Sequence, residues 1–165
     1  KVEMTKRATS LIGDEIELKQ MEAEYFMISP ELDQFNHREF FDHLSEFMKR
    51  EDFNSYTTWD SVGVMIDPQR LAKKEYLDYT HFYSRIEDVT QAQMVFLKPK
   101  GLYLVAYHRG SYDTTYQTYD RMIEFAKQNN LEFLGYSYEE FILDEISVIG
   151  YDNYLTQIQI QVQLK

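Results

Sequence analysis

The sequence contains no cysteine, and it has only three prolines, six glycines and one tryptophan among its 165 residues. The absence of cysteine excludes disulfides, thiolate metal sites and cysteine nucleophiles, and it fits a reducing compartment. No apolar run approaches the roughly 18 to 20 residues that a membrane-spanning helix needs, and no secretory signal is visible at the start. We therefore expect a cytoplasmic, globular protein with no membrane partner.

Basic residues are also scarce, because 17 lysines and arginines stand against 28 aspartates and glutamates, for a net charge of −11. This acidic balance argues against contact between this chain and a phosphate backbone. Aromatic residues are abundant instead, with 14 tyrosines and 11 phenylalanines. Most of them are expected to fill a core, but aromatic faces beside carboxylates also bind lipophilic cations. Lipophilic cationic small molecules are therefore the favoured partners.

The motifs of several common enzyme classes are missing from the chain. It has no glycine-rich phosphate loop, no histidine cluster at zinc-ligand spacing and no G-x-S-x-G elbow. The four histidines are scattered, and His81, which lies among aromatic residues, is expected to be structural. We expect no enzyme activity, and hence no catalytic residue, no metal and no cofactor.

The hydrophobic pattern predicts one domain that contains both strands and helices. Residues 1–14 show no clear period and are interpreted as a linker remnant, which leaves a domain over residues 15–165. Alternating apolar residues predict strands, and apolar residues at helical spacing predict helices. The expected strands span 15–29 (one strand, or two joined by a bulge near Glu22), 62–66, 76–86, 102–108, 131–144 and 154–164, and the expected helices span 36–50 and 116–128. A further apolar-rich run covers residues 91–97.

The same order of elements, strand, helix, strand, strand, occurs twice in this prediction. At an offset of 78 residues, segment 41–47 lies over segment 119–125 and matches its Asp, its Glu and its final Phe. Such an internal repeat indicates two similar structural units. We expect an α+β fold of two pseudo-two-fold-related repeats, about 15–86 and about 101–164, with an antiparallel sheet and a central ligand groove.

Two adjacent carboxylates, Glu139 and Glu140, lie within the predicted strand 131–144. Successive side chains of a strand point to opposite faces, so Glu139 shares one face with Phe141 and Glu140 shares the other with Tyr138. A carboxylate among such neighbours has to be hydrogen-bonded, protonated or matched by a cation. The alternation alone does not decide which glutamate points inward. It also leaves open that both are edge residues facing lysines or solvent.

Three stretches of the sequence resemble a known family. They are KGLYLVAY at residues 100–107, YEEFI at residues 138–142 and NYLTQIQI at residues 153–160. In order and spacing they resemble the GyrI-like (gyrase-inhibitor-like) ligand-binding domain, and within it the C-terminal multidrug-binding domain of BmrR-type regulators of the MerR family. The resemblance covers nearly the whole chain. It implies the effector-sensing domain of a transcription regulator that binds bulky lipophilic cations.

The resemblance also implies the residues of the binding site. The cation-binding glutamate of such domains matches Glu139, so that Glu139 faces the groove and Glu140 faces away. Where the resemblance puts a tyrosine after Ser61, this chain has Val62, so one aromatic wall is expected to be missing. The aromatic residues that match the site are Phe141, Tyr154, Phe41 and Tyr79, with either Tyr112 or Tyr116.

The resemblance further implies partners outside this chain. DNA would be bound only by a domain that this chain lacks, and the full-length regulator would be a homodimer. Two alternatives stay open: a stand-alone GyrI-like protein that sequesters or hydrolyses small molecules, and a protein-interaction module whose acidic surface mimics nucleic acid. A hydrolase would use Glu139 or Glu140 as a base, but adjacent strand residues point apart and do not act together on one bond without a bulge.

Overall fold

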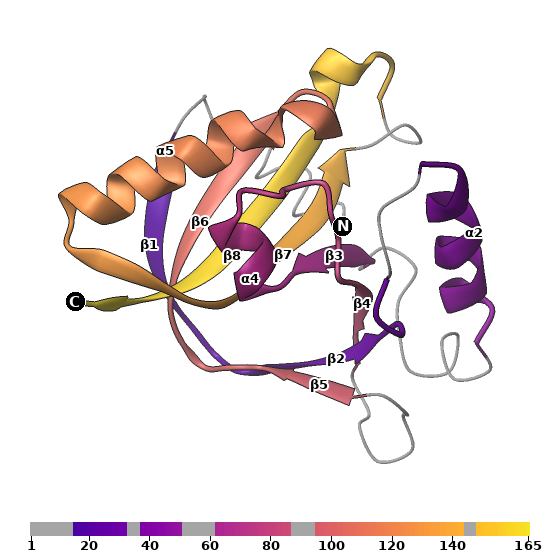
Figure 1. Ribbon diagram of the computed structural model, residues 1–165, viewed down its shortest axis with the longest axis horizontal. Coiled ribbons are helices and arrows are strands. Elements are labelled where there is room, and N and C mark those ends of the chain that lie inside the picture. Colours follow the sequence, from indigo (N-terminus) through magenta and orange to yellow (C-terminus); the bar gives the residue numbers. More distant parts are fainter. Residues whose placement is uncertain (1–14, 33–36, 51–61, 87–94, 144–147) are drawn as a thin grey trace.

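The structure of the protein is a computed structural model, which describes residues 15–32, 37–50, 62–86, 95–143 and 148–165. The strands are β1 (Ile16–Met21), β2 (Glu24–Ile28), β3 (Gly63–Ile66), β4 (His81–Arg85), β5 (Val95–Lys98), β6 (Gly101–Arg109), β7 (Leu131–Leu143) and β8 (Leu155–Leu164). The α-helices are α2 (His37–Met48), α4 (Pro68–Ala72) and α5 (Thr115–Gln128), and the 3-10 turns are η2 (Tyr112–Thr114) and η3 (Tyr151–Asn153). The strands form one sheet in the order β1-β6-β8-β7-β3-β4-β2-β5, which confirms the α+β class (Figure 1).

All the strand pairs of the sheet are antiparallel, and they differ from the predicted strands in two places. The predicted strand 15–29 is two strands with different neighbours, because β1 pairs with β6 whereas β2 pairs with β4 and β5. The predicted strand 76–86 is wrong over residues 76–80, since β4 begins only at His81. Tyr76 and Tyr79 are buried, but they lie in a connecting segment, so burial of aromatic residues here does not mark a strand.

Helix α4 is absent from the expected elements. It begins because the side chain of Asp67 accepts a hydrogen bond from the backbone N–H of Arg70 at 2.8 Å. Pro68 occupies the first turn, where its fixed backbone angle suits a helix and its missing N–H is not needed. With only five residues, α4 is too short to show a helical period in the sequence.

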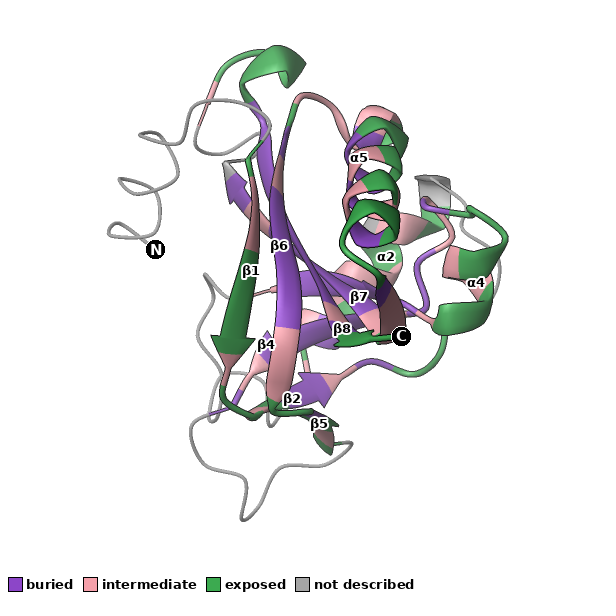
Figure 2. Cartoon of the chain, turned by 90° about the vertical axis from the view of Figure 1, so that its left-hand side faces the viewer, coloured by how far each residue is buried: buried purple, intermediate pink, exposed green. Residues whose placement is uncertain are grey.

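The two faces of the sheet carry different cores. Helices α2, α4 and α5 lie on one side of the sheet, where Phe47, Tyr119 and Ile158 belong to one large buried cluster (Figure 2). The opposite face carries a second cluster that includes Phe26 and Tyr138. The central strands are therefore covered on both faces, and their side chains are mostly buried.

Strand β7 joins the two predicted halves of the domain, because it pairs with β3 on one side and with β8 on the other. The β3 pairing is close at Gly63, where an added Cβ would lie 2.2 Å from the carbonyl oxygen of Glu139 and 2.6 Å from the ring of Tyr83. A glycine at this position lets the Tyr83 ring pack against the backbone. The two-fold relation between the halves stays a prediction.

Candidate ligand-binding site

The two adjacent glutamates of β7 lie on opposite faces of the sheet, and both are buried. Glu139 is 0% exposed and Glu140 is 4% exposed. Glu139 lies on the face that α5 covers, and Glu140 lies on the other, where the guanidinium of Arg85 binds both its oxygens at 3.1 and 3.0 Å. The alternative that both glutamates are edge residues facing lysines or solvent is therefore wrong. Pairing of β7 on both sides buries them.

Glu139 has one satisfied and one unsatisfied oxygen. Its Oε2 accepts a hydrogen bond from the hydroxyl of Tyr119 at 2.6 Å, and that hydroxyl lies 2.6 Å from the Oγ of Ser137. Its Oε1 is buried and has no hydrogen-bond partner among the described residues. Burial raises the pKa of Glu139 from 4.5 to about 7, against a smaller opposite effect of the Tyr119 hydrogen bond. This carboxyl group is therefore divided between its neutral and charged forms near neutral pH.

Several aromatic residues lie on the same side of the sheet as this carboxyl group. The ring of Tyr119 stacks on Tyr76 with 4.2 Å between centroids and 2° between planes. Burial, and then the charges of Glu139 and Tyr112, raise the pKa of Tyr79 well above its usual value, which places Tyr79 close to both. The ring of Tyr112 contacts two further aromatic residues, Phe141 at 5.0 Å and Tyr154 at 5.3 Å.

The structure thus gathers most of the predicted site residues on one face of the sheet. Tyr112 contacts Phe141 and Tyr154, and Tyr79 lies within electrostatic range of Glu139 and Tyr112.

Three other positions that the sequence analysis named do not belong to this group of contacts. Tyr116 is 49% exposed and lies at the mouth of a hollow rather than beside Phe141 and Tyr154, so the geometry favours Tyr112. Phe41 belongs to α2, but its side chain lies outside the described residues. Val62 packs against the large core.

Two residues beside Glu139 were missed at the level of sequence, Tyr119 and Tyr76. Tyr119 is fully buried and donates the hydrogen bond to Glu139, and Tyr76 stacks on it. A signal for Tyr119 was available, because the internal repeat lays it over Phe41, which was itself a candidate. The same offset lays Tyr76 over Tyr154, another candidate, so the repeat carried a signal for Tyr76 as well.

A comparison with known families decides the relationship of this chain. Residues 15–163 match the GyrI-like small molecule binding domain. The chain belongs to the GyrI-like family.

A curated relative supports this assignment. The multidrug-efflux transporter 2 regulator of Bacillus subtilis (strain 168) is 28% identical over 163 residues. The match takes in 99% of this chain but 59% of that protein, so the chain spans about three fifths of the relative's length.

Solved structures show the same fold at low sequence identity. The C-terminal domain of EcmrR matches with a TM-score of 0.70 and 14% identity, over 93% of this chain and 100% of that one. A hydrolase from Listeria innocua matches with a TM-score of 0.56 and 10% identity, over 98% of each chain. A protein bound to tetraphenylphosphonium matches with a TM-score of 0.52 and 14% identity, over 90% of this chain and 94% of that one.

A hollow of about 540 Å³ opens next to the aromatic group of this GyrI-like domain. Tyr76 lines the hollow and stacks on Tyr119, so this stacked pair connects the hollow to Glu139. The charged residues that line the hollow are Glu75, Asp78 and Asp113 against Lys74, so the hollow favours positively charged ligands. Asp78 also forms an ion pair with Arg70 at 3.2 Å.

His108 fixes the segment that carries Tyr112 in this GyrI-like domain. The buried imidazole lies at the end of β6, with Nδ1 2.8 Å from the Oγ1 of Thr118 in α5. Its Nε2 lies 3.1 Å from the carbonyl oxygen of Ser111 and 2.9 Å from the Oγ1 of Thr114. Burial lowers the pKa of His108, which favours the neutral ring in these contacts. The histidine therefore ties β6, η2 and α5 together around Tyr112.

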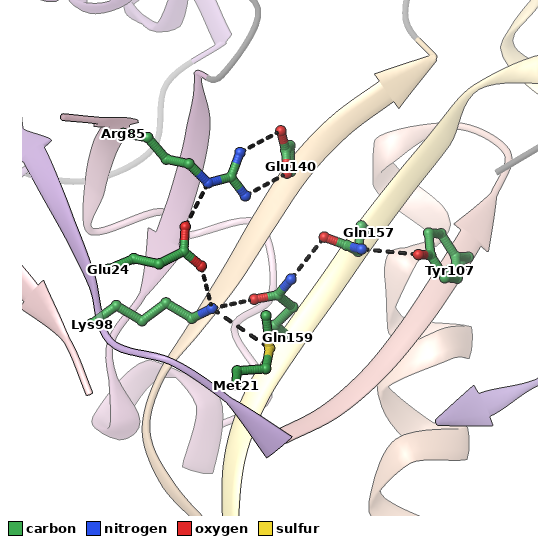
Figure 3. A network of polar contacts seen from close by, with 8 residues as sticks. All are labelled: Met21, Glu24, Arg85, Lys98, Tyr107, Glu140, Gln157 and Gln159. Atoms are coloured by element: carbon green, nitrogen blue, oxygen red, sulfur yellow. Dashed lines mark hydrogen bonds and ion pairs between the residues drawn. The ribbon is translucent and has the colours of Figure 1, made fainter. Parts of the chain in front are cut away.

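On the opposite face of β7, Glu140 belongs to a network of charged and amide groups (Figure 3). Arg85 bridges Glu140 to Glu24 through its Nε at 2.7 Å. The Nζ of Lys98, which is 1% exposed, donates to Glu24 at 3.3 Å and to Gln159 at 2.5 Å. The sequence pattern of alternating Gln and apolar residues in β8 gave no sign that Gln159 would be buried.

Proposed function

We propose that this GyrI-like domain is the effector-sensing domain of a transcription regulator and that it binds lipophilic cations at Glu139. One observation carries the proposal: the Oε1 atom of Glu139 is buried without a partner among the described residues, while the hydroxyl of Tyr119 binds the other oxygen. Such an oxygen is a natural counterpart for a charge that brings no hydrogen-bond donors of its own, as in a quaternary cation. The regulator name of the Bacillus subtilis relative supports the sensing role.

The binding energy would come from several modest contributions. Each good contact between a cation and an aromatic face contributes about 0.5 to 2 kcal/mol. The pairing of the cation with Glu139 roughly offsets the desolvation of both charges, so shape and apolar burial supply most of the rest. Because burial raises the pKa of Glu139 to about 7, a cation also displaces a proton from part of the population near neutral pH.

The acidic hollow beside Tyr76 provides an approach to the site. A cation attracted by the carboxylates at the rim would meet the stacked rings of Tyr76 and Tyr119 first. Movement of this pair would then expose Glu139, which accepts a hydrogen bond from Tyr119. The solved protein of the same fold that is bound to tetraphenylphosphonium makes that cation a suitable probe.

The role in a whole regulator extends beyond this chain. The curated relative is longer than this chain. We propose that a region outside this chain contacts DNA and that the whole regulator is a homodimer located in the cytoplasm. Among the described residues, no helix has the length and apolar character to cross a membrane.

Hydrolysis is a weaker candidate for this site. Some proteins of the same fold are named hydrolases, but their identity to this chain is about 10% and shows the fold alone. Glu139 and Glu140 bind partners on opposite faces of the sheet, Tyr119 and Arg85, so they do not form an acid pair. A binding role needs only one carboxylate. A protein-interaction role would predict indifference to cations.

Isothermal titration with tetraphenylphosphonium tests the proposal. We expect saturable binding that Glu139→Gln weakens tenfold or more, because removing one partner of a buried charge pair costs about 2 to 5 kcal/mol and tenfold corresponds to about 1.4 kcal/mol. Glu124→Gln removes the same charge from an exposed position of α5 and should leave affinity unchanged. Tetraphenylborate, which has the same shape and the opposite charge, should not bind this site. Equal affinities of wild type and Glu139→Gln would overturn the proposal.

A further inference from the structure

A second hollow lies on the face of the sheet opposite to Glu139. Its volume is about 160 Å³, and five strands contribute to its lining. Met21 and Ile142 supply apolar surface, whereas Lys19, Arg85 and Tyr107 supply groups that donate hydrogen bonds. Gln157 and Gln159 complete the lining.

The glutamines of this hollow belong to a hydrogen-bond chain with one direction (Figure 3). Lys98 donates to the Oε1 of Gln159 at 2.5 Å, and the amide nitrogen of Gln159 donates to the Oε1 of Gln157 at 2.8 Å. The amide nitrogen of Gln157 donates to the hydroxyl of Tyr107 at 2.9 Å. Lys98 has no acceptor to offer, so the order of donors is fixed along the chain. The hydroxyl proton of Tyr107 comes last, and no described residue accepts it.

Arg85, which also lines this hollow, has N–H groups that no described residue accepts. A guanidinium carries five N–H groups. Arg85 uses one on Glu24 and two on Glu140, through contacts of 2.7, 3.1 and 3.0 Å. Two N–H groups are therefore left without an acceptor among the described residues. The carboxylates hold the guanidinium in a fixed orientation, which preorganises those two donors.

The charge of this region differs in sign from that of the whole chain. Three cations, Lys19, Arg85 and Lys98, line the hollow or its network, against two carboxylates, Glu24 and Glu140. The local balance is one positive charge, in a chain whose net charge is −11. One bound anion of single charge would neutralise it. The donors of Lys19, Arg85 and Tyr107 are suited to the two oxygens of a carboxylate.

We propose that this hollow is a second ligand site, which binds a small apolar monocarboxylate. The carboxylate would accept hydrogen bonds from Tyr107 and Arg85 and pair with Lys19, while its apolar part would lie against Met21 and Ile142. A volume of about 160 Å³ is close to the roughly 150 Å³ of a cavity that holds one benzene ring, so the ligand is of benzoate size.

This site is independent of cation binding at Glu139. The two sites lie on opposite faces of β7, where neighbouring residues Glu139 and Glu140 contact different partners. A chain that fails to bind tetraphenylphosphonium can still bind benzoate, and the reverse also holds. The two proposals therefore fail separately.

The test is a titration of the isotopically labelled chain with benzoate, followed by backbone amide NMR. We expect saturable shifts at the amides of Gln157 and Gln159, and no saturable shift with benzamide, the neutral isostere. Tyr107→Phe removes only the terminal hydroxyl, and Lys19→Gln removes only an exposed charge. Each should weaken binding about five- to tenfold, as expected for one charge-assisted hydrogen bond or ion pair.

Two matched controls complete the design. Lys127→Gln removes an exposed charge from α5, far from the hollow, and should bind benzoate as wild type does. Glu139→Gln should also bind benzoate as wild type does. The proposal is overturned if benzoate gives no saturable shifts, if benzamide binds as well as benzoate, or if Tyr107→Phe and Lys19→Gln both retain wild-type affinity.

Discussion

Replacing Glu139 by glutamine should stabilise the empty domain at neutral and alkaline pH. Burial raises the pKa of Glu139 from 4.5 to about 7, so the folded chain holds this proton more tightly than the unfolded chain does. Below pH 4.5 both states are protonated and the group has no effect on stability. As pH rises through the window from 4.5 to 7, the unfolded chain ionises first, and the free energy of unfolding falls. Above pH 7 the loss is complete.

The size of this effect follows from the width of the window. A difference of one pKa unit corresponds to about 1.4 kcal/mol, so the full loss is about 3 kcal/mol. Between about pH 5 and about pH 8, the free energy of unfolding should fall by about 2 to 3 kcal/mol from this group. Glutamine has no charge to desolvate, and its side-chain oxygen can still accept the hydrogen bond from Tyr119. Glu139→Gln should therefore lack this loss.

Urea unfolding of both proteins at these two pH values measures the effect. The informative quantity is the change, from pH 5 to pH 8, in the stability difference between Glu139→Gln and wild type. This difference cancels the contributions of His81 and His108, whose pKa values burial lowers and which act in the opposite direction. Glu124→Gln, an exposed replacement, is the control and should show no such change. A change below about 1 kcal/mol would refute the reasoning that burial dominates the pKa of Glu139.

Four further outcomes are expected. Affinity for tetraphenylphosphonium should rise up to about tenfold per pH unit below pH 7 and level off above it, because the cation must displace the proton of Glu139; calorimetry at several pH values would show a flat profile if this is wrong. Gly63→Ala should destabilise the fold by about 1 to 3 kcal/mol in urea unfolding, since the new Cβ would lie 2.2 Å from a backbone oxygen of β7; a loss near zero would contradict the close packing. Tyr119→Phe removes the hydrogen bond to Glu139 and should raise the pKa of that carboxyl further, which carbon NMR of the labelled side chain measures; an unchanged or lower pKa would count against it. His108→Gln should reduce the loss of stability that wild type shows as pH falls below about 6.5, because the unfolded chain binds the His108 proton more tightly than the folded chain does, and His81 contributes the remainder; an unchanged dependence of stability on pH in this range would contradict this role.

Much of the fold could be predicted from the sequence because its elements have clear local periods. Helix α5 and strands β6, β7 and β8 lie within two residues of their predicted bounds. The failures have local causes too. Tyr76 and Tyr79 are buried aromatic residues of a connecting segment rather than of a strand, and α4 depends on the cap of Asp67 rather than on a repeating pattern.

The candidate site was only partly predictable. The family resemblance of the sequence selected Glu139 and several aromatic residues. It did not select Tyr119, which lies in α5, 20 residues before Glu139 in the sequence. It also gave no sign of the network around Arg85, because Arg85 and Glu140 are 55 residues apart. Contacts over such separations depend on which strands become neighbours, and no local pattern carries that information.

The sequence alone determined that Glu139 and Glu140 point to opposite faces, since alternation is a property of the extended backbone itself. Tertiary structure decided what each glutamate meets. Pairing of β7 with β3 and β8 buries both carboxylates, and the packing of α5 leaves one oxygen of Glu139 without a partner among the described residues. Desolvation depends on all the surrounding atoms, so the raised pKa of Glu139 and the paired charge of Glu140 arise only in the folded chain.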